Sequence, residues 1–159
     1  MSILGQYLDT PIGLLAIREQ DDAICAIEFV ETMDSEPVNT PLLLEAKKQL
    51  QDYFNGSRKA FNLPLKAKGT LFQQQVWEQL QSVCYGQTAS YADIANKVAN
   101  PKAVRAVGAA NGKNPIAIVV PCHRIIGSNG RLTGYAGGLE RKAFLLDLER
   151  GLRLSGNVT

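Results

Sequence analysis

The sequence predicts an α+β protein in which a small α/β domain precedes a mainly helical domain. Short apolar runs at 3–8, 12–18 and 24–30 are separated by turn-forming and polar residues, a pattern typical of antiparallel strands. Farther along the chain, helix-start signals recur before apolar residues at helical spacing. We therefore expect an N-terminal scaffold domain at 1–65 and a C-terminal domain at 66–159.

The N-terminal domain should combine a hairpin, formed by the second and third strands, with one long helix. Thr40 and Pro41 suit the N-cap and the first helical position, and apolar residues follow at helical spacing up to an Asn-Gly pair at 55–56. A further short strand is expected at 61–63. Cys25 lies within the third strand and is expected to be a small core residue.

Two capping boxes predict helices in the C-terminal domain. Thr70 and Gln73 precede an apolar helix face beside Trp77, for which core packing is expected rather than base stacking. Ser90 and Asp93 open a short helix that begins at the next residue.

Another short helix is expected at 101–110, started by an Asn-Pro pair at 100–101. With the preceding helix it predicts a helix-turn-helix. Small residues such as Ala106 dominate it, so its backbone can approach a partner closely. Lys102 and Arg105 are three positions apart and should share a face. A helix–helix contact would also favour small residues, but the basic edge favours a nucleic-acid groove.

The run at 116–120 is apolar and rich in β-branched residues, which predicts a buried strand. Pro121 should end this strand, because proline has no N–H for a sheet ladder. Cys122, His123 and Arg124 follow, and His123 is the only histidine of the chain. A free thiol has a pKa of about 8.5 and reacts as a thiolate. A packed thiol beside a surface imidazole is the ordinary interpretation of an isolated Cys-His pair, but the surrounding motifs favour a nucleophilic site in which the imidazole serves as the base.

A glycine-rich loop and a final helix follow this site. The loop at 127–138 contains five glycines and Tyr135, so it can approach a ligand closely. The helix at 139–149 ends in Glu149. A carboxylate is electrostatically unfavourable in the last turn of a helix. We therefore expect Glu149 either to lie at the surface with little effect or to have another partner.

Composition and charge narrow the class of protein. Apolar residues make up 45% of the chain, and no apolar run approaches the roughly 18 residues of a membrane helix. Three cysteines in an odd, widely spaced set, with one histidine, argue against disulfides and zinc and favour a cytoplasmic setting. Residues 1–65 carry 5 Lys and Arg against 10 Asp and Glu, whereas residues 66–159 carry 12 against 5. A polyanion partner is therefore expected for the C-terminal half only.

Several motifs between Phe72 and Glu149 together resemble the O6-alkylguanine-DNA alkyltransferases, which repair DNA by direct reversal. These motifs are FQQQVWEQLQSVCYGQTASYADIA, NPKAVRAVGAANGKNP, PCHRII and GYAGG. The resemblance implies a ribonuclease H-like N-terminal domain and a C-terminal helix-turn-helix domain. It also implies a monomer that takes an alkyl group from O6-alkylguanine in flipped nucleotides of duplex DNA, once per molecule and without a cofactor. Cys84 departs from the proline that the family commonly has before Tyr-Gly.

The resemblance assigns roles to residues of the reacting centre. Cys122 would accept the alkyl group, His123 would draw off its proton through a water molecule, and Glu149 would orient the imidazole. Asn114 would help to hold the site together. Tyr91 would donate a hydrogen bond to the base as guanine leaves.

Further residues would bind DNA and shape the alkyl pocket. Arg105 would fill the gap left by the rotated nucleotide, with Lys102, Ala106 and Tyr91 also at the DNA. The alkyl pocket would be lined by Tyr135, Gly137, Val120 and Pro121. Alkyl size and activity on O4-alkylthymine are left open by the sequence.

Three other functions compete with alkyl transfer. A non-catalytic lesion-binding relative would lack the acceptor cysteine, and Cys122 is present. A helix-turn-helix regulator would bind one duplex sequence tightly without a lesion. A Cys-His hydrolase would turn over many acyl substrates, but no second motif supports it.

Overall fold

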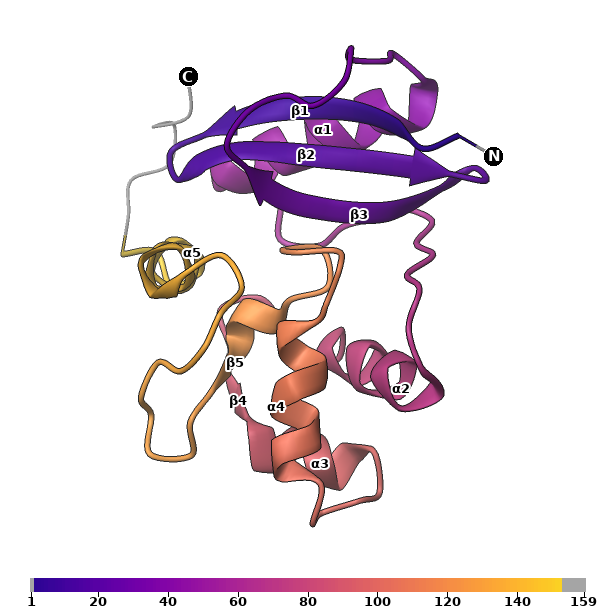
Figure 1. Ribbon diagram of the computed structural model, residues 1–159. Helices are drawn as coiled ribbons and strands as arrows, with labels where there is room; N and C mark the ends of the chain where they lie inside the picture. Colours follow the sequence, from indigo (N-terminus) through magenta and orange to yellow (C-terminus); the bar gives the residue numbers. More distant parts are fainter. Residues whose placement is uncertain (1, 153–159) are drawn as a thin grey trace.

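The computed structural model describes residues 2–152, which form a three-stranded sheet packed on helices (Figure 1). Strands β1 (Leu4–Thr10), β2 (Gly13–Gln20) and β3 (Ala23–Val30) are antiparallel in the order β1-β2-β3. The β2–β3 turn consists of Asp21 and Asp22, with φ angles of 53° and 63°. Two positive φ angles suit the right-handed twist of a two-residue hairpin. The three predicted strands are therefore confirmed.

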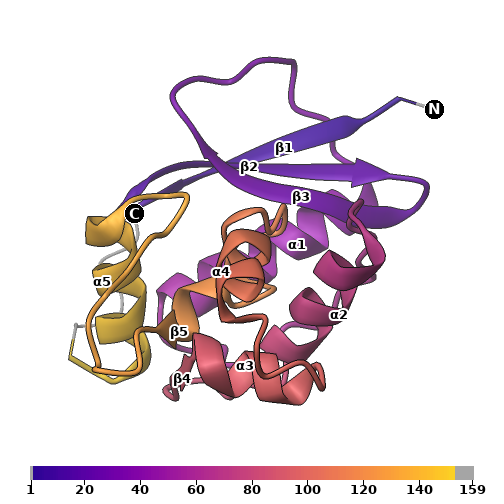
Figure 2. The same ribbon diagram turned by 60° about the horizontal axis from the view of Figure 1, so that its bottom comes forward.

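Helix α1 (Pro41–Phe54) covers the face of the sheet that is turned toward the C-terminal helices (Figure 2). The Thr40 hydroxyl accepts a hydrogen bond from the Leu43 amide at 3.0 Å, which caps the helix as predicted. Its buried face includes Leu50 and Tyr53, both fully buried. One hydrophobic core thus runs from the sheet through α1 into the C-terminal helices.

Between residues 66 and 152 the structure contains four α-helices and a short parallel strand pair. The capping boxes at the starts of α2 and α3 are both present, as predicted. The Trp77 indole is buried and donates to the Ala110 carbonyl at 2.8 Å, which ties α2 to α4. The bounds are α2 (Leu71–Leu80), β4 (Ala89–Ser90), α3 (Tyr91–Lys97), α4 (Val104–Gly112), β5 (Ile125–Ile126) and α5 (Leu139–Glu149).

Helix α4 begins at Val104, so the predicted start at the Asn-Pro pair is wrong. Asn100 instead belongs to the C-terminal cap of α3. Ala99 has a φ of 59°, and the Asn100 amide donates to the Ala95 carbonyl at 3.0 Å. This is a Schellman motif, which satisfies the last carbonyls of a helix. Lys102 consequently lies in the turn between α3 and α4 and does not share a helical face with Arg105.

The apolar run at 116–120 is buried but is not a strand, which corrects the prediction. Ile116 makes one parallel bridge to Ile27, and the chain then turns, with a φ of 72° at Ile118. The Asn114 side chain supports this turn, donating to the Val120 carbonyl at 2.8 Å and accepting from the Ile116 amide at 3.0 Å. A buried turn has the same apolar composition as a buried strand, so composition could not separate the two.

The strand expected at 61–63 is also absent from the described structure. Leu65 instead makes an isolated parallel bridge to Ile24. Both bridges lie on β3, whose other side pairs with β2, so the two connecting segments partly cover a sheet edge that would otherwise be open. Among the described residues, no helix is long and apolar enough to cross a membrane.

Candidate active site

A short 3-10 helix, Cys122–Arg124, places the predicted nucleophile and base at the centre of the molecule. Cys122 is only 5% exposed, and His123 is fully buried. The Asn111 amide donates to the Cys122 carbonyl at 3.3 Å, which ties the 3-10 helix to the end of α4. Asn114 holds the preceding turn, so it supports the site as expected from the sequence.

Glu149, at the end of α5, accepts hydrogen bonds from several separate segments of the chain. His123 Nε2 lies 2.6 Å from Glu149 Oε2, and the Arg124 Nε atom donates to Glu149 Oε1 at 2.8 Å. The Tyr53 hydroxyl donates to Oε2 at 2.5 Å, and the Gly86 amide donates to Oε1 at 3.4 Å. The carboxylate therefore has the other partner that its unfavourable position in the helix suggested.

The charges of this group fix the tautomer of the imidazole. Burial opposes ionisation of Glu149, but its hydrogen bonds and charge interactions with His123 and Arg124 prevail and lower its pKa from 4.5 to about 2. Burial lowers the pKa of His123 below 6.5, against the influence of Glu149, so the imidazole is neutral at pH 7. Because an ionised carboxylate only accepts hydrogen bonds, Nε2 carries the proton. Nδ1 is left with a lone pair, and it has no hydrogen-bond partner within the described residues.

The surroundings of the Cys122 thiol favour its protonated form, whereas the sequence led us to expect a thiolate poised by its neighbour. Burial raises the pKa of this thiol, although a hydrogen bond from Asn114 and the charge of Lys142 oppose the rise. The thiol therefore needs a base to ionise, and the next residue, His123, has an Nδ1 atom that is free to act as one.

Lys142 is a buried cation that the sequence analysis missed. It is fully buried, and its Nζ atom donates to the carbonyls of Ile125 at 2.5 Å and Thr133 at 2.7 Å. Burial lowers its pKa from 10.5 to about 8, and Cys122 opposes this shift. A signal was available, because Lys142 precedes Leu145 and Glu149 by three and seven positions and so lies on the buried stripe of α5.

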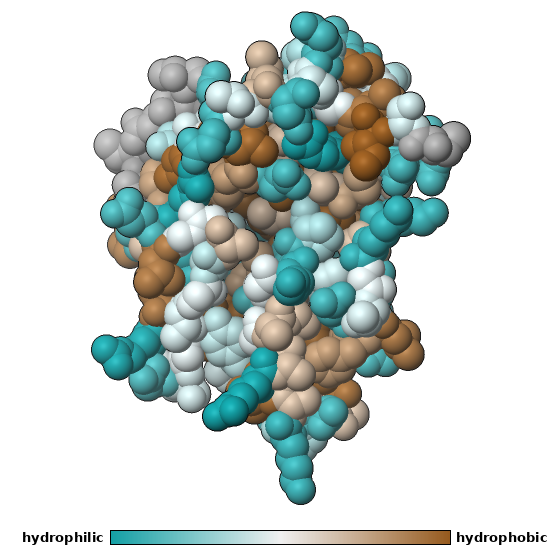
Figure 3. Space-filling view, in the orientation of Figure 1, coloured by the Kyte–Doolittle hydropathy of each residue, from teal (hydrophilic) through white to brown (hydrophobic). Residues whose placement is uncertain are grey.

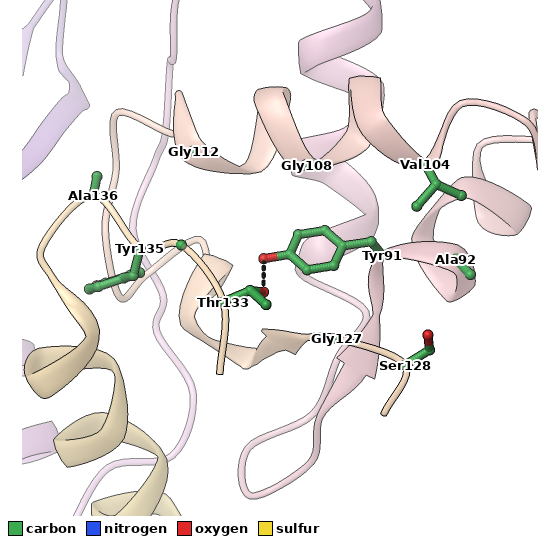
Figure 4. Close-up of a pocket in the computed structure, with 11 residues that line it drawn as sticks. Tyr91, Ala92, Val104, Gly108, Gly112, Gly127, Ser128, Thr133, Tyr135 and Ala136 are labelled. Carbon is green, nitrogen blue, oxygen red and sulfur yellow. Dashed lines mark hydrogen bonds between the residues drawn. The ribbon is translucent and has the colours of Figure 1, made fainter. Parts of the chain in front are cut away.

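A cavity of about 530 Å³ opens beside α3 and α4 (Figure 4). The Tyr91 hydroxyl lies in it, 2.8 Å from the Thr133 hydroxyl of the glycine-rich loop. Gly108 of α4 also lines the cavity and lies against the Tyr91 ring, since a Cβ atom there would lie 3.8 Å from that ring (Figure 4). Tyr135 also lines this cavity, and the close-up shows its ring directed away from Tyr91. The remaining lining residues are Ala92, Val104, Gly112, Gly127, Ser128, Gly134 and Ala136.

Tyr135 connects this cavity to the thiol. Burial raises its pKa well above 10, and the nearby Cys122 adds to the rise. Its hydroxyl is buried without a hydrogen-bond partner in residues 2–152. Gly137 permits this packing, since a Cβ atom there would lie 2.8 Å from the Tyr135 ring.

Val120 and Pro121 do not line the cavity, contrary to the pocket predicted from the sequence. Both are buried, because the turn held by Asn114 folds them into the core. Pro121 faces a separate hollow beside Tyr85 and Arg124. Of the four predicted pocket residues, Tyr135 lines the cavity and Gly137 shapes it through the Tyr135 ring.

The outer surface of α4 is exposed and has small side chains. Arg105, Ala106 and the nearby Lys102 are all exposed, and Val104 is 37% exposed. The space-filling view shows weakly hydrophobic atoms low on the front face, where α4 lies, with hydrophilic side chains projecting around them (Figure 3). The helix therefore presents a smooth, accessible surface next to the cavity.

The site places a buried cysteine and histidine beside two short helices, α3 and α4, that are joined by a turn, an arrangement typical of helix-turn-helix DNA-binding proteins. Family models described as 6-O-methylguanine DNA methyltransferase match almost the whole chain, the ribonuclease-like domain at 3–67 and the DNA-binding domain at 71–151. The chain belongs to this family.

Named relatives and solved structures agree with this assignment. The constitutive methylated-DNA–protein-cysteine methyltransferase of Bacillus subtilis is 53% identical over 152 residues, covering 89% of this chain and 92% of that protein. The enzyme of the same name from Methanosarcina acetivorans is 46% identical over 147 residues, covering 89% and 94%. The crystal structure of Mycobacterium tuberculosis O6-methylguanine methyltransferase superimposes with a TM-score of 0.86 at 41% identity, covering 94% of each chain. The crystal structure of M. tuberculosis OGT in complex with DNA superimposes with a TM-score of 0.86 at 43% identity, again covering 94% of each chain. The α+β class predicted from the sequence is confirmed.

Proposed function

We propose that this protein repairs duplex DNA by moving the alkyl group of O6-alkylguanine onto the Cys122 sulfur. The observation that carries the proposal is the neutral His123 beside Cys122, with Nε2 held by the ionised Glu149 and Nδ1 left free. The names of the relatives, which describe methylated DNA as donor and a protein cysteine as acceptor, support the same reaction.

The chemistry follows from this arrangement. His123 Nδ1 takes the Cys122 proton through a bridging water molecule, and the thiolate attacks the alkyl carbon. The carbon–oxygen bond of the lesion breaks as the sulfur–carbon bond forms, and guanine leaves with a negative charge. A donor near the leaving group stabilises this charge as it develops. Tyr91 is the donor that we assign, and it must exchange its hydrogen bond to Thr133 for one to the base.

Lys142 assists the thiolate electrostatically. Its ammonium group is held in place by two backbone carbonyls, and its charge lowers the pKa of the Cys122 thiol. Asn114 acts in the same direction through its hydrogen bond to the thiol. Both interactions strengthen when the sulfur becomes negative, so they favour the ionised acceptor.

The target atom lies inside the duplex, so the nucleotide must rotate out of the stack at a cost of a few kcal/mol. The exposed surface of α4 suits close contact with a minor groove, where inserted side chains can fill the gap in the stack. Arg105 is the exposed cation that we place in this gap, with Lys102 and Ala106 at the backbone. The flipped base would then enter the cavity between Tyr91 and Tyr135.

The product is a thioether, which has no electrophilic carbonyl for water to attack, so each molecule reacts once and needs no cofactor. A monomer in the cytoplasm completes the proposal, since a reducing compartment keeps the Cys122 thiol free. All three cysteines are unpaired in the described chain.

Intact mass spectrometry tests the proposal. Incubation with a duplex that contains O6-methylguanine should replace one hydrogen of the protein by one methyl group. Cys122→Ala should abolish this change and keep DNA binding, whereas the control Cys84→Ala, at an exposed thiol, should react normally. Methylation of Cys122→Ala would refute the assignment. Tight binding to one undamaged sequence without methylation would favour the regulator, and multiple turnover of an acyl substrate would favour the hydrolase.

A further inference from the structure

Tyr53 reaches the reacting centre from the N-terminal part of the chain. It lies in the last turn of α1, is fully buried, and is separated in sequence from Glu149 by 96 residues. Its hydroxyl donates to Glu149 Oε2 at 2.5 Å. No local feature of the sequence marks it, because a tyrosine on the apolar face of a helix usually packs in the core.

The hydroxyl binds the same carboxylate oxygen as the imidazole. His123 Nε2 lies 2.6 Å from Glu149 Oε2, and the Arg124 Nη2 atom donates to this oxygen at 3.1 Å. Three donors therefore share one oxygen. A carboxylate oxygen divided among several donors is a weaker partner for each of them, because each bond withdraws part of its negative charge.

The Tyr53 ring cannot easily turn away from this position. It packs edge-on against Phe54 and Tyr85, with ring centroids 5.4 and 6.2 Å apart, and it lies tilted against Phe61 at 5.5 Å. Burial, followed by the charge of Glu149, raises the pKa of Tyr53 well above 10, so the hydroxyl keeps its proton. It is thus a permanent donor with a fixed direction.

We propose that Tyr53 is a positioning residue for alkyl transfer, which fixes the Glu149 carboxylate and limits how strongly its Oε2 atom draws the imidazole toward the protonated form. The proposal rests on the function proposed above. It gives the N-terminal region a part in the chemistry, since α1 supplies a donor to the carboxylate that holds the base. Without the hydroxyl, Oε2 would interact more strongly with His123 and make the imidazole more basic.

Other titratable groups also face the His123–Glu149 pair. They come from several elements, and a change at Tyr53 leaves each of them in place. They are Tyr85 between α2 and β4, Cys122 and Arg124 in the 3-10 helix, Tyr135 in the glycine-rich loop, and Lys142 in α5. A shift in the titration of His123 on removal of one hydroxyl therefore reports the Tyr53 interaction.

The test is an NMR titration of the imidazole in Tyr53→Phe, without DNA. His123 is the only histidine of the chain, so its ring signals need no assignment. Tyr7→Phe is the matched control, since Tyr7 is a buried tyrosine of the same sheet-and-helix region whose hydroxyl bonds to Asp34 and Ser35. The midpoint should move to higher pH in Tyr53→Phe and stay at the wild-type value in Tyr7→Phe.

Single-turnover rates against pH give the functional readout on a duplex with O6-methylguanine. At pH values below the wild-type midpoint, Tyr53→Phe should react about threefold to tenfold more slowly. A hydrogen bond to a charged group is worth about one to two powers of ten, and the Tyr53 hydroxyl weakens the bond between Glu149 and His123 by only part of that amount. At high pH, where the imidazole is neutral in both proteins, the rates should converge. A merely structural role would lower the rate equally at every pH.

Two outcomes would overturn the proposal: an unchanged imidazole midpoint in Tyr53→Phe, or a uniform loss of rate. Circular dichroism establishes whether Tyr53→Phe is folded. If it is not folded, the titration midpoint of His123 is compared between the wild-type protein and Glu149→Gln, which changes the same carboxylate. An unchanged midpoint there also counts against the proposal. Failure of the proposed function would be recognised separately, since the wild-type protein itself would then take no methyl group.

Discussion

The carboxylate of Glu149 should be one of the largest single contributors to the stability of this protein. Its pKa falls from 4.5 to about 2 in the folded state, a difference of about 2.5 units. At about 1.4 kcal/mol per unit, this corresponds to a stabilisation of about 3 to 4 kcal/mol. Because the pKa is lowered on folding, the stabilisation is fully present above pH 4.5 and is lost as the pH falls toward 2.

Glu149→Gln removes this charge and leaves Arg124 buried without its anion. We therefore expect the free energy of unfolding at pH 7, measured by urea titration, to fall by about 3 to 4 kcal/mol. Asp147→Asn is the control, since Asp147 lies in the same helical turn, and its effect should stay within about 0.5 kcal/mol.

The pH dependence provides the sharper check on this reasoning. The difference in stability between the wild-type protein and Glu149→Gln should narrow steadily as the pH falls from 4.5, because protonation removes the same charge from the wild type. A variant as stable as the wild type at pH 7 would refute the reasoning. A difference that stays constant between pH 7 and pH 3 would refute it equally.

Three further predictions concern the reaction. Arg105→Ala should slow repair of duplex DNA much more than reaction with free O6-alkylguanine base, compared by single-turnover kinetics; equal losses would exclude gap filling. Tyr91→Phe should slow transfer about tenfold or more, while Thr133→Val, which removes only the partner of the Tyr91 hydroxyl, should leave the rate within about threefold. Lys142→Met should slow transfer most at neutral pH, where the lysine of the wild type, with a pKa of about 8, is mainly charged; the loss should shrink above pH 9, and a loss independent of pH would contradict its electrostatic role.

Local signals in the sequence predicted much of the fold. The two capping boxes and the cap at Thr40 depend on hydrogen bonds between residues three positions apart, and the strands are joined by short turns that the sequence marks. Such bonds form whenever the local sequence allows them, so spacing and residue type suffice to predict them. The adjacent Cys122 and His123 were visible for the same reason. The division at 65/66 stays a prediction.

Predictions failed where the local pattern had two physical solutions. The run at 116–120 is as apolar as a buried strand, but Asn114 and a bridge to Ile27 fold it into a turn. The Asn-Pro pair at 100–101 could start a helix, but the Schellman motif of α3 uses Asn100 first. In both cases a hydrogen bond outside the pattern decided the conformation.

By itself, the sequence determined the three N-terminal strands, the capped helices, the adjacent Cys122 and His123 and the resemblance to a family, because all of these depend on patterns along short stretches of the chain. Only the tertiary structure brought Tyr53 and Lys142 near that pair and joined Arg124 to Glu149. It also decided that burial raises the pKa of the Cys122 thiol and that Glu149 is shared among several donors. Desolvation and charge pairing depend on every group packed around an atom, and segments 96 residues apart meet only when the core that joins them has formed.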